Sequence, residues 1–260
     1  MQVPQTPQPA DLPKLAATIL GRVRGQGPRV HCITNAVAQN FTANMLLAAG
    51  AVPSMTITPD EVGQFVARCD ALLINLGTFD EERRVATDIA IEAAAQDDLP
   101  WVLDPVFIDR SPARAEFARE LVQRRPDTVR PNHAEFSALS GAGVSHDALM
   151  QYARTQDVVL ALSGETDLVA DATHIAAISN GDPLMARVTA MGCAGSALVA
   201  ACLAVEADPW SASACALLML GIAGEQAAQD SKGPGSFAVA IVDALANLDG
   251  KVIVERARVT

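Results

Sequence analysis

The sequence predicts an α/β fold in which a mostly parallel sheet lies between two layers of helices. Short apolar segments alternate along the chain with helical patterns, which is the order of repeated βαβ units. Half of the 260 residues are hydrophobic, so a large core can form. No linker-like run divides the chain. We therefore expect one domain over residues 1–260, with residues 1–11 as a loose, proline-containing lead-in.

Six short apolar segments are predicted as strands of the sheet. They cover residues 29–33, 52–57, 71–76, 101–103, 127–130 and 157–162. Five helices are predicted among them, over residues 35–49, 59–69, 81–96, 113–123 and 147–154. Thr58, Pro59 and Glu61 match a capping box with proline at the first helical position. Gly50 can end the helix before it in the left-handed conformation.

The pattern changes after residue 162. Two short apolar segments, 168–170 and 175–178, predict a small antiparallel excursion at the edge of the sheet. The rest of the chain is mostly helical, with helices expected over about 191–205, 211–229 and 235–248. The glycine-containing segment 232–237 is interpreted mainly as a structural helix start.

Charge and composition exclude several classes of function. The formal net charge is −11 and the 19 basic residues do not form a stripe, which argues against a nucleic-acid partner. The N-terminus has no apolar signal segment, and no apolar run is long and clean enough to suggest a membrane span. The five cysteines are scattered without metal-ligand spacing, which favours a reducing compartment and a cytoplasmic location.

Polar residues follow the predicted strands at their carboxyl ends. In open α/β sheets, ligands bind beyond this edge, so the pattern predicts a functional site there. The residues concerned are Thr34, Asn35, Met55, Asn75, Gly77, Thr78, Asp104, the segment 130–135, Ser163 and Gly164.

The segment MGCAGS, residues 191–196, begins a predicted helix with very small side chains. Backbone N–H groups at a helix start are unpaired and carry partial positive charge, so this segment can hold a phosphate or a developing negative charge. A thiol at Cys193 in the first turn is expected to have a lowered pKa. The alternative is that small residues allow close packing and that Cys193 is a small apolar filler.

Two acidic motifs are candidates for metal binding. In VRPNHAEF, Asn132 and Glu135 lie on one face of a helix and can hold Mg²⁺ with its waters, while Arg130 can pair with a phosphate. The alternative, favoured on local sequence, is a capping box formed by Asn132 and Glu135. Asp104 in LDPV is placed for a metal or a reacting hydroxyl, or for a common Asp-Pro turn.

Other familiar signatures are absent from the sequence. Its four histidines show no triad or metal-ligand spacing and are interpreted as surface or core residues. The chain has no GxxxxGK[ST] phosphate-binding loop, and no GxGxxG motif follows the first predicted strand.

The order of the motifs resembles that of the hydroxyethylthiazole kinase family over nearly the whole chain after about residue 12. The matching motifs are HCITN (31–35), Asn40 with FTAN (41–44), GAVPSM (50–55), LLINLGT (72–78), LDPV (103–106), VRPNHAEF (129–136), LSGETD (162–167), MGCAGSA (191–197) and GPGSF (233–237). The resemblance implies a three-layer ribokinase-like fold. It also implies ATP-dependent phosphorylation of the hydroxyethyl group of 4-methyl-5-(2-hydroxyethyl)thiazole in thiamine salvage, with a homotrimer whose sites lie between subunits.

The resemblance also assigns roles to single residues of this chain. Met55, Ala190 and Asn35 would contact the thiazole, and Arg130 and Ser163 would contact ATP. Mg²⁺ would be held by Asp104, Asn132 and Glu135. Cys193 would be the catalytic proton acceptor, and the anion hole would be formed by Met191, Gly192 and Cys193.

Several positions depart from the family pattern. The family usually reads GTGC where this chain has Ala190, Met191, Gly192 and Cys193, and RGN where Pro131 removes a backbone donor. Ser163 replaces a usual threonine and keeps the hydroxyl group. Bulkier residues, 107–109, stand where the family has small ones.

The departures leave three other readings open. The protein could be a ribokinase-like kinase for another heterocyclic alcohol. It could be a lyase of the same fold that repairs hydrated nicotinamide nucleotides. It could also be a weakly catalytic or non-catalytic binder of thiazole or nucleotide. The first two would be expected to carry an acidic residue at position 193.

Overall fold

An eight-stranded sheet runs through the middle of the molecule in the order β2-β1-β3-β4-β5-β6-β7-β8. In this computed structural model, which describes residues 8–260, the six strands from β1 to β6 are parallel. The last two strands pair antiparallel, as the sequence predicted. The strands are β1 (Arg29–Ile33), β2 (Val52–Ser54), β3 (Ala71–Asn75), β4 (Trp101–Asp104), β5 (Thr128–Val129), β6 (Val159–Leu162), β7 (Asp167–Ala170) and β8 (Ile175–Ile178).

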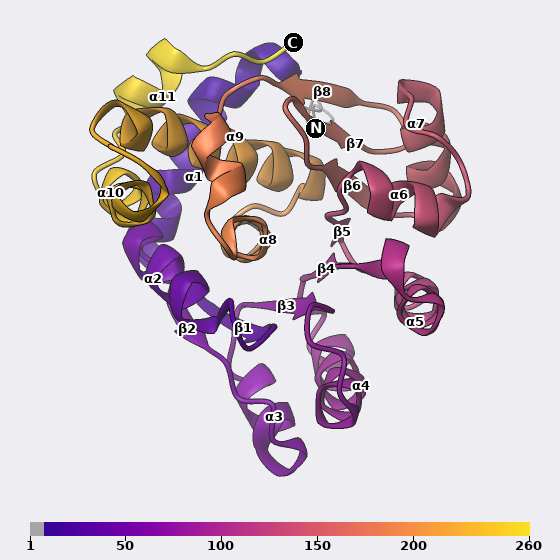
Figure 1. Cartoon of the computed structure of the whole chain (residues 1–260). Coiled ribbons are helices and arrows are strands. Elements are labelled where there is room, and N and C mark those ends of the chain that lie inside the picture. Colours follow the sequence, from indigo (N-terminus) through magenta and orange to yellow (C-terminus); the bar gives the residue numbers. More distant parts are fainter. Residues whose placement is uncertain (1–7) are drawn as a thin grey trace, which may run out of the picture.

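Helices cover both faces of the sheet, which confirms the three-layer α/β/α fold (Figure 1). One layer contains α3 (Pro59–Val66), α4 (Glu81–Gln96), α5 (Pro112–Val122), α6 (His133–Ser140) and α7 (His146–Gln156). The other contains α1 (Leu12–Gln26), α2 (Gln39–Ala49), α8 (Met191–Leu203), α9 (Pro209–Gln229), α10 (Pro234–Ala246) and α11 (Gly250–Arg256). Three short 3₁₀ turns are η1 (Pro9–Asp11), η2 (Ile108–Arg110) and η3 (Pro183–Arg187).

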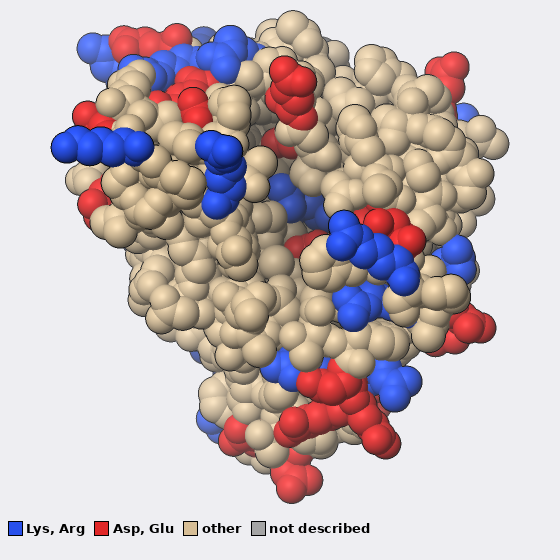
Figure 2. All heavy atoms as spheres, viewed as in Figure 1, with Lys and Arg blue, Asp and Glu red and all other residues tan. Residues whose placement is uncertain are grey.

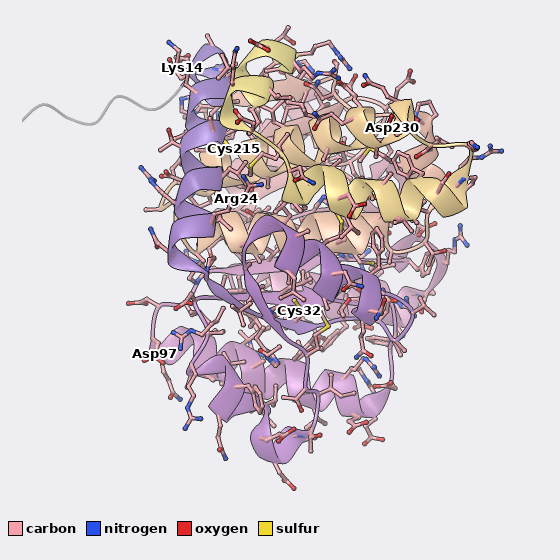
Figure 3. All side chains as sticks on the ribbon, turned by 90° about the vertical axis from the view of Figure 1, so that its left-hand side faces the viewer. Lys14, Arg24, Cys32, Asp97, Cys215 and Asp230 are labelled. Atoms are coloured by element: carbon pink, nitrogen blue, oxygen red, sulfur yellow. The ribbon has the colours of Figure 1, made fainter. Side chains whose placement is uncertain are left out.

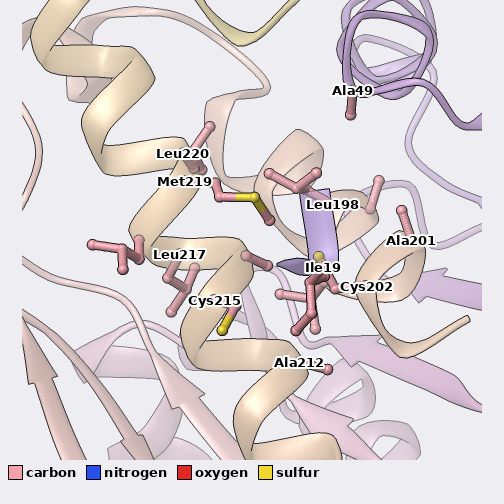
Figure 4. Packing of buried hydrophobic residues seen from close by; sticks show 14 of the residues in the cluster. Ile19, Ala49, Leu198, Ala201, Cys202, Ala212, Cys215, Leu217, Met219 and Leu220 are labelled. Atoms are coloured by element: carbon pink, nitrogen blue, oxygen red, sulfur yellow. The ribbon is translucent and has the colours of Figure 1, made fainter. Parts of the chain in front are cut away.

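The centre of the second layer is the pair of helices α8 and α9. Every residue of α8 from Cys193 to Leu203 is buried, and alanine, glycine and serine let α9 approach closely. Figure 4 shows Leu198 and Cys202 of α8 packed near Cys215 and Met219 of α9. Among the described residues, α9 is the one helix with the length and composition of a membrane span, and 83% of its apolar window is buried inside the protein.

The C-terminal elements are tied to the first helix and to the last strand. Arg24 of α1 donates hydrogen bonds to the carbonyl groups of Leu245, Ala246 and Leu248, where α10 ends (Figure 3). The carboxyl end of a helix carries partial negative charge, so a cation at this end is favourable. Val259 then pairs antiparallel with Ile178 of β8.

Most predicted elements are present, with shifted ends. The predicted strand 52–57 ends at Ser54, and the helix expected from residue 35 begins at Gln39, because residues 34–38 form a turn in which Ala38 N–H binds Asn35 O. Gly50 has the expected left-handed conformation, with φ of 96°. Thr58 and Pro59 do begin α3, but the predicted capping box is wrong: the Glu61 carboxylate accepts its hydrogen bond from Thr56 Oγ1.

Two of the described helices, α1 and α11, were not predicted, and α6 was anticipated only through the capping box of Asn132 and Glu135. Helix α1 buries Leu12, Ala16, Ile19, Leu20 and Val23, a spacing that marks one face of a helix. The prolines and glycines around it obscured this signal. Residues 1–7 of the expected loose lead-in lie outside the described residues, and Pro9–Asp11 form a 3₁₀ turn rather than a loose segment.

Candidate active site

Three neighbouring strands deliver a row of polar side chains to the start of α8. Asn35 follows β1, Asn75 ends β3 and Asp104 ends β4, and all three are buried. Asn75 Nδ2 donates to Asp104 Oδ2 at 2.7 Å, and Asn35 Nδ2 donates to Asn75 Oδ1 at 3.1 Å. Asn35 Nδ2 also lies 3.2 Å from Cys193 Sγ. A continuous chain of hydrogen bonds therefore joins the Asp104 carboxylate to the Cys193 sulfur.

The carboxylate sets the direction of both amides in this chain. An ionised carboxylate only accepts hydrogen bonds, so Asn75 must turn its NH₂ group toward Asp104 and its oxygen toward Asn35. Asn35 must then present its own NH₂ group to Asn75 and Cys193. Its Oδ1 is left buried without a partner among the described residues, so a hydroxyl donor can bind there.

Glycine and serine complete the surroundings of this chain. A Cβ atom on Gly77 would lie 2.6 Å from Asn35 Nδ2, so only glycine leaves room for that amide. Ser196 Oγ donates to Asp104 Oδ2 at 2.8 Å from the second turn of α8. The sequence placed Asn75 at this edge without assigning it a role, and it gave Ser196 no place in the site. The position of Asn75 at a strand end was a usable signal, and Ser196 lies three residues beyond Cys193 on the same helical face.

The expected lowering of the Cys193 pKa is wrong. The thiol is 9% exposed, and burial raises its pKa to about 11, with the negative charge of Asp104 acting in the same direction. The hydrogen bond from Asn35 lowers the pKa but does not outweigh these causes. The partial positive charge at a helix start stabilises a thiolate, but burial removes the water that would also stabilise it. At Cys193 the effect of burial is the larger one.

The start of α8 does provide unpaired backbone donors. Ala190 is the residue before the helix and has φ of 72°, in the left-handed region. Met191 N–H makes one long hydrogen bond, 3.4 Å to Val188 O. Among residues 8–260, no acceptor binds the backbone N–H groups of Gly192 and Cys193. These two groups can therefore bind an anion.

Arg130 joins this helix start to a large cavity. Its Nη1 donates to Gly192 O at 3.0 Å, while its buried Nε has no partner among the described residues. A Cβ on Gly195 would lie 3.2 Å from Arg130 Nη2, so the small residues of α8 serve both the packing and the approach of this guanidinium. The close packing that the sequence offered as an alternative for these small residues is therefore present.

The cavity beside Arg130 has a volume of about 690 Å³. It lies between the loops after β6 and β8, η3, the start of α8 and α9, and Ser163, Met191 and Gly192 line it together with Arg130. Ser163 Oγ lies 3.4 Å from Pro131 O, on the same side as Arg130. Figure 2 shows a hollow near the middle of this face, with basic and acidic side chains in its depth, while the other basic side chains are dispersed among acidic ones.

The second carboxylate, Glu135, is held by a capping box. Its Oε2 accepts from Asn132 N, its Oε1 accepts from Phe107 N, and Asn132 Oδ1 accepts from Glu135 N. The alternative favoured on local sequence is thus confirmed. Burial, and then the negative charge of Asp104, raise the pKa of Glu135 to about 7.

The donor set beside Asp104 fits a hydrated cation. Among the described residues, no three His, Cys, Asp or Glu side chains form a compact metal cluster. Mg²⁺, however, usually uses one or two carboxylates and keeps several waters. Burial raises the pKa of Asp104, although the charge of Arg130 and hydrogen bonds from Ser196 and Asn75 oppose the shift. The Asp104 charge in turn helps to raise the pKa of Glu135, so two buried carboxylates here would be favoured by a cation.

The remaining predicted residues lie at the same edge of the sheet. Met55 directly follows β2, the strand next to the one that delivers Asn35, and it packs half-buried against the core of the α8 layer. Ala190 stands next to the anion-binding N–H groups. Asn132 is exposed at the start of α6.

The sheet order and the two helix layers define the ribokinase-like fold. A ribokinase-like superfamily protein from Enterococcus faecalis V583 superimposes with a TM-score of 0.65 at 14% identity, covering 94% of this chain and 90% of that one, which shows the shared fold. The chain belongs to the hydroxyethylthiazole kinase family, whose family model matches residues 20–251.

Two proteins illustrate how similar the chain is to this family. The "probable hydroxyethylthiazole kinase" of Agrobacterium fabrum is 44% identical over 94% of each chain. The solved hydroxyethylthiazole kinase of Pyrococcus horikoshii OT3 superimposes with a TM-score of 0.91 at 37% identity, covering 95% of this chain and 98% of that one. The family predicted from the motif order is confirmed.

Proposed function

We propose that the protein transfers the γ-phosphoryl group of ATP to the hydroxyl group of 4-methyl-5-(2-hydroxyethyl)thiazole, a step of thiamine salvage. One observation carries the proposal. The first turn of α8 combines the unpaired N–H groups of Gly192 and Cys193 with the buried Cys193 thiol, and its Gly192 carbonyl oxygen accepts a hydrogen bond from the Arg130 guanidinium. Phosphoryl transfer needs positioned donors for the moving phosphoryl group more than it needs covalent chemistry.

The nucleotide is assigned to the cavity beside Arg130. Its volume of about 690 Å³ is in the range of small-molecule and cofactor sites. Arg130 would bind phosphate oxygens through the guanidinium nitrogens that face the cavity, and Ser163 would offer a hydroxyl group. Met191 and Gly192, which with Cys193 would form the proposed anion hole at the start of α8, line this cavity.

The thiazole alcohol is assigned to the side of α8 that faces β1 and α2. Asn35, which donates to the Cys193 sulfur, would lie beside the substrate hydroxyl group, whose hydrogen would be directed at that sulfur. Met55 and Ala190 would contact the ring. This arrangement places the hydroxyl oxygen between the Cys193 sulfur and the anion-binding N–H groups.

Mg²⁺ is the proposed metal cofactor. Asp104 and Glu135 would hold the ion through water molecules, with Asn132 near its outer shell. The metal supplies neutralisation of the phosphate charge when it is bound. Ser196 and Asn75 would keep the Asp104 carboxylate in place by occupying one of its oxygens, Oδ2, so that Oδ1 stays available.

Cys193 is the proposed proton acceptor. In a loose transition state the proton leaves the attacking hydroxyl group late, so a strong base is not needed early in the reaction. The thiolate is the form that can accept the proton. Asn35 favours this form by donating a hydrogen bond to the sulfur.

A homotrimer is proposed because apolar side chains surround the edge of the sheet near Met55. Four apolar side chains are exposed in this region: Val37 (77%) in the turn before α2, Leu47 (58%) on α2, Val52 (51%) on β2 and Phe65 (42%) on α3. Their neighbour β2 is an edge strand of only three residues. Covering this region with a further copy would close the thiazole side of the site. Sedimentation equilibrium of the purified protein tests the oligomeric state.

A cytoplasmic location is proposed on the basis of the thiols. All five cysteines are free and buried in the structure. Free thiols in this number are typical of reducing compartments. Fractionation of cells that express the tagged protein tests the location.

Measurement of ADP release tests the proposed activity. We expect ADP only when ATP, Mg²⁺ and the thiazole alcohol are all present. Pyridoxal and hydroxymethylpyrimidine serve as competing alcohols. Equal turnover with one of them would contradict the assigned substrate, and tight binding without ADP release would show that the protein is a binder rather than a kinase.

A further inference from the structure

His31 is a buried histidine that the proposed reaction does not use. It lies on β1, is 0% exposed and pairs in register with Ser54 of β2. The Phe65 ring of α3 covers it with a centroid distance of 6.0 Å. The sequence placed His31 in the motif HCITN but gave it no role beyond a surface or core residue.

The imidazole binds the chain on both sides of Met55. Nδ1 lies 2.8 Å from Ser54 Oγ, and Nε2 lies 3.1 Å from Thr56 O. A carbonyl oxygen can only accept, so Nε2 carries the hydrogen and Nδ1 accepts the hydrogen of the Ser54 hydroxyl group. The two contacts therefore select one tautomer of the ring.

The imidazole is also what attaches this segment to the sheet. Pairing of β2 with β1 stops at Ser54, and α3 begins only at Pro59. Among residues 8–260, no other hydrogen bond joins residues 55–58 to the sheet, because the hydroxyl group of Thr56 is bound to Glu61 of α3. Met55 is thus held on one side by the strand pairing and imidazole bond at Ser54, and on the other side by the bond between the imidazole and Thr56 O.

The ring keeps this geometry across the pH range in which kinases work. Burial lowers the pKa of His31 to about 4, although the hydrogen bond to Thr56 opposes the shift. A neutral imidazole donates at one nitrogen and accepts at the other, which is the pattern that both neighbours require.

We propose that His31 is a positioning residue that fixes Met55 against the heterocycle of the substrate by holding Ser54 and Thr56. The inference rests on the proposed function, since it takes Met55 as a substrate contact. It assigns to His31 an effect on the thiazole side of the site and none on the nucleotide side. A histidine that only filled the core would affect both sides through general loss of stability.

The first test compares Michaelis constants of two leucine variants. His31→Leu keeps an apolar side chain of similar bulk and removes both hydrogen bonds, while His146→Leu changes an exposed histidine on α7 and serves as the matched control. We expect His31→Leu to raise KM for the thiazole alcohol about tenfold, as loss of one or two hydrogen bonds implies. KM for ATP should stay within about twofold, the ordinary scatter of such constants. Equal rises in both constants would overturn the proposal.

A double-mutant cycle tests whether His31 acts through Met55. In a Met55→Ala background, the effect of His31→Leu on KM for the thiazole alcohol should largely disappear, because the side chain being positioned is gone. An undiminished effect in that background contradicts the proposal. His31→Gln retains an N–H donor near the position of Nε2 and should restore part of the affinity.

Two further measurements keep the inference testable. If His31→Leu does not fold, Ser54→Ala removes only the contact at Nδ1 and should raise KM for the thiazole alcohol alone. If the wild-type protein releases no ADP with the thiazole alcohol, the proposed function fails. Calorimetric binding of the same alcohol then replaces KM in the cycle, and unchanged affinity in His31→Leu overturns the inference separately.

Discussion

Asn35 Nδ2 donates a hydrogen bond to Cys193 Sγ across 3.2 Å, and the same nitrogen donates to Asn75 Oδ1. The sulfur thus accepts a hydrogen bond from an amide whose orientation is fixed, through Asn75, by the Asp104 carboxylate. The strand ends and the start of α8 are therefore coupled by chemistry and not only by proximity.

Replacement of the thiol should affect the chemical step. We expect Cys193→Ala to lower kcat by roughly a hundredfold, the usual contribution of a positioned proton acceptor, with KM for ATP almost unchanged. Cys193→Asp should retain or increase kcat, because a carboxylate can accept the proton. Steady-state ADP release measures both variants. Wild-type turnover in Cys193→Ala would exclude the thiol as the proton acceptor.

The pH dependence follows from the raised pKa of Cys193. Because this pKa is about 11, the thiol is mostly protonated at neutral pH, and the thiolate fraction rises with pH. The single-turnover rate should therefore increase about tenfold per pH unit between about pH 6 and pH 9. Cys193→Asp should show a flatter profile, since a carboxyl group ionises at lower pH. A flat wild-type profile would contradict thiolate participation.

Loss of Asn75 should disconnect the two ends of the hydrogen-bonded chain. Asn75→Leu removes one buried hydrogen bond of Asp104 and one of Asn35, which leaves them Ser196 and Cys193 as partners and should cost about 2 kcal/mol of unfolding free energy. It should also lower kcat, because Asn35 is then free to turn its oxygen toward the sulfur. Denaturant unfolding and ADP release measure the two effects. The control is Asn247→Leu, which removes a side-chain bond to Asp243 O at an exposed helix end and should change neither strongly.

The sequence was sufficient to predict which residues lie at the strand ends of this site, but not which of their side chains hydrogen-bond to each other. Asn35, Asp104 and Arg130 follow apolar segments, so the topology of a parallel sheet brings them to one edge. The orientation of each amide depends on contacts between residues far apart in the sequence. Asn75 and Asp104 are separated by 29 residues, and Asn35 and Cys193 by 158 residues. Local patterns carry no information on such pairs.

The pKa of Cys193 shows why local rules fail at buried sites. The position of the thiol in the first turn of a helix was read correctly, and the unpaired N–H groups are there. The sign of the pKa shift depends on burial and on Asp104, whose charge comes from another element. Helix α1 was not predicted for a different reason. Its buried residues have helical spacing, but the prolines and glycines in and around it are typical of loops.

Ala190 offers a test of strain at the anion-binding helix start. Its φ of 72° lies in the left-handed region, which costs an alanine about 1 kcal/mol relative to glycine. Ala190→Gly should therefore raise the unfolding free energy by up to about 1 kcal/mol, because the strain removed exceeds the entropy that glycine adds to the unfolded chain.

The matched control is Ala204→Gly, because Ala204 ends α8 with an ordinary φ of −62°. This change should lower the unfolding free energy by about 0.5–1 kcal/mol. Denaturant unfolding of both variants gives the comparison. If Ala190→Gly destabilises the protein as much as Ala204→Gly does, the proposed net strain at position 190 is contradicted.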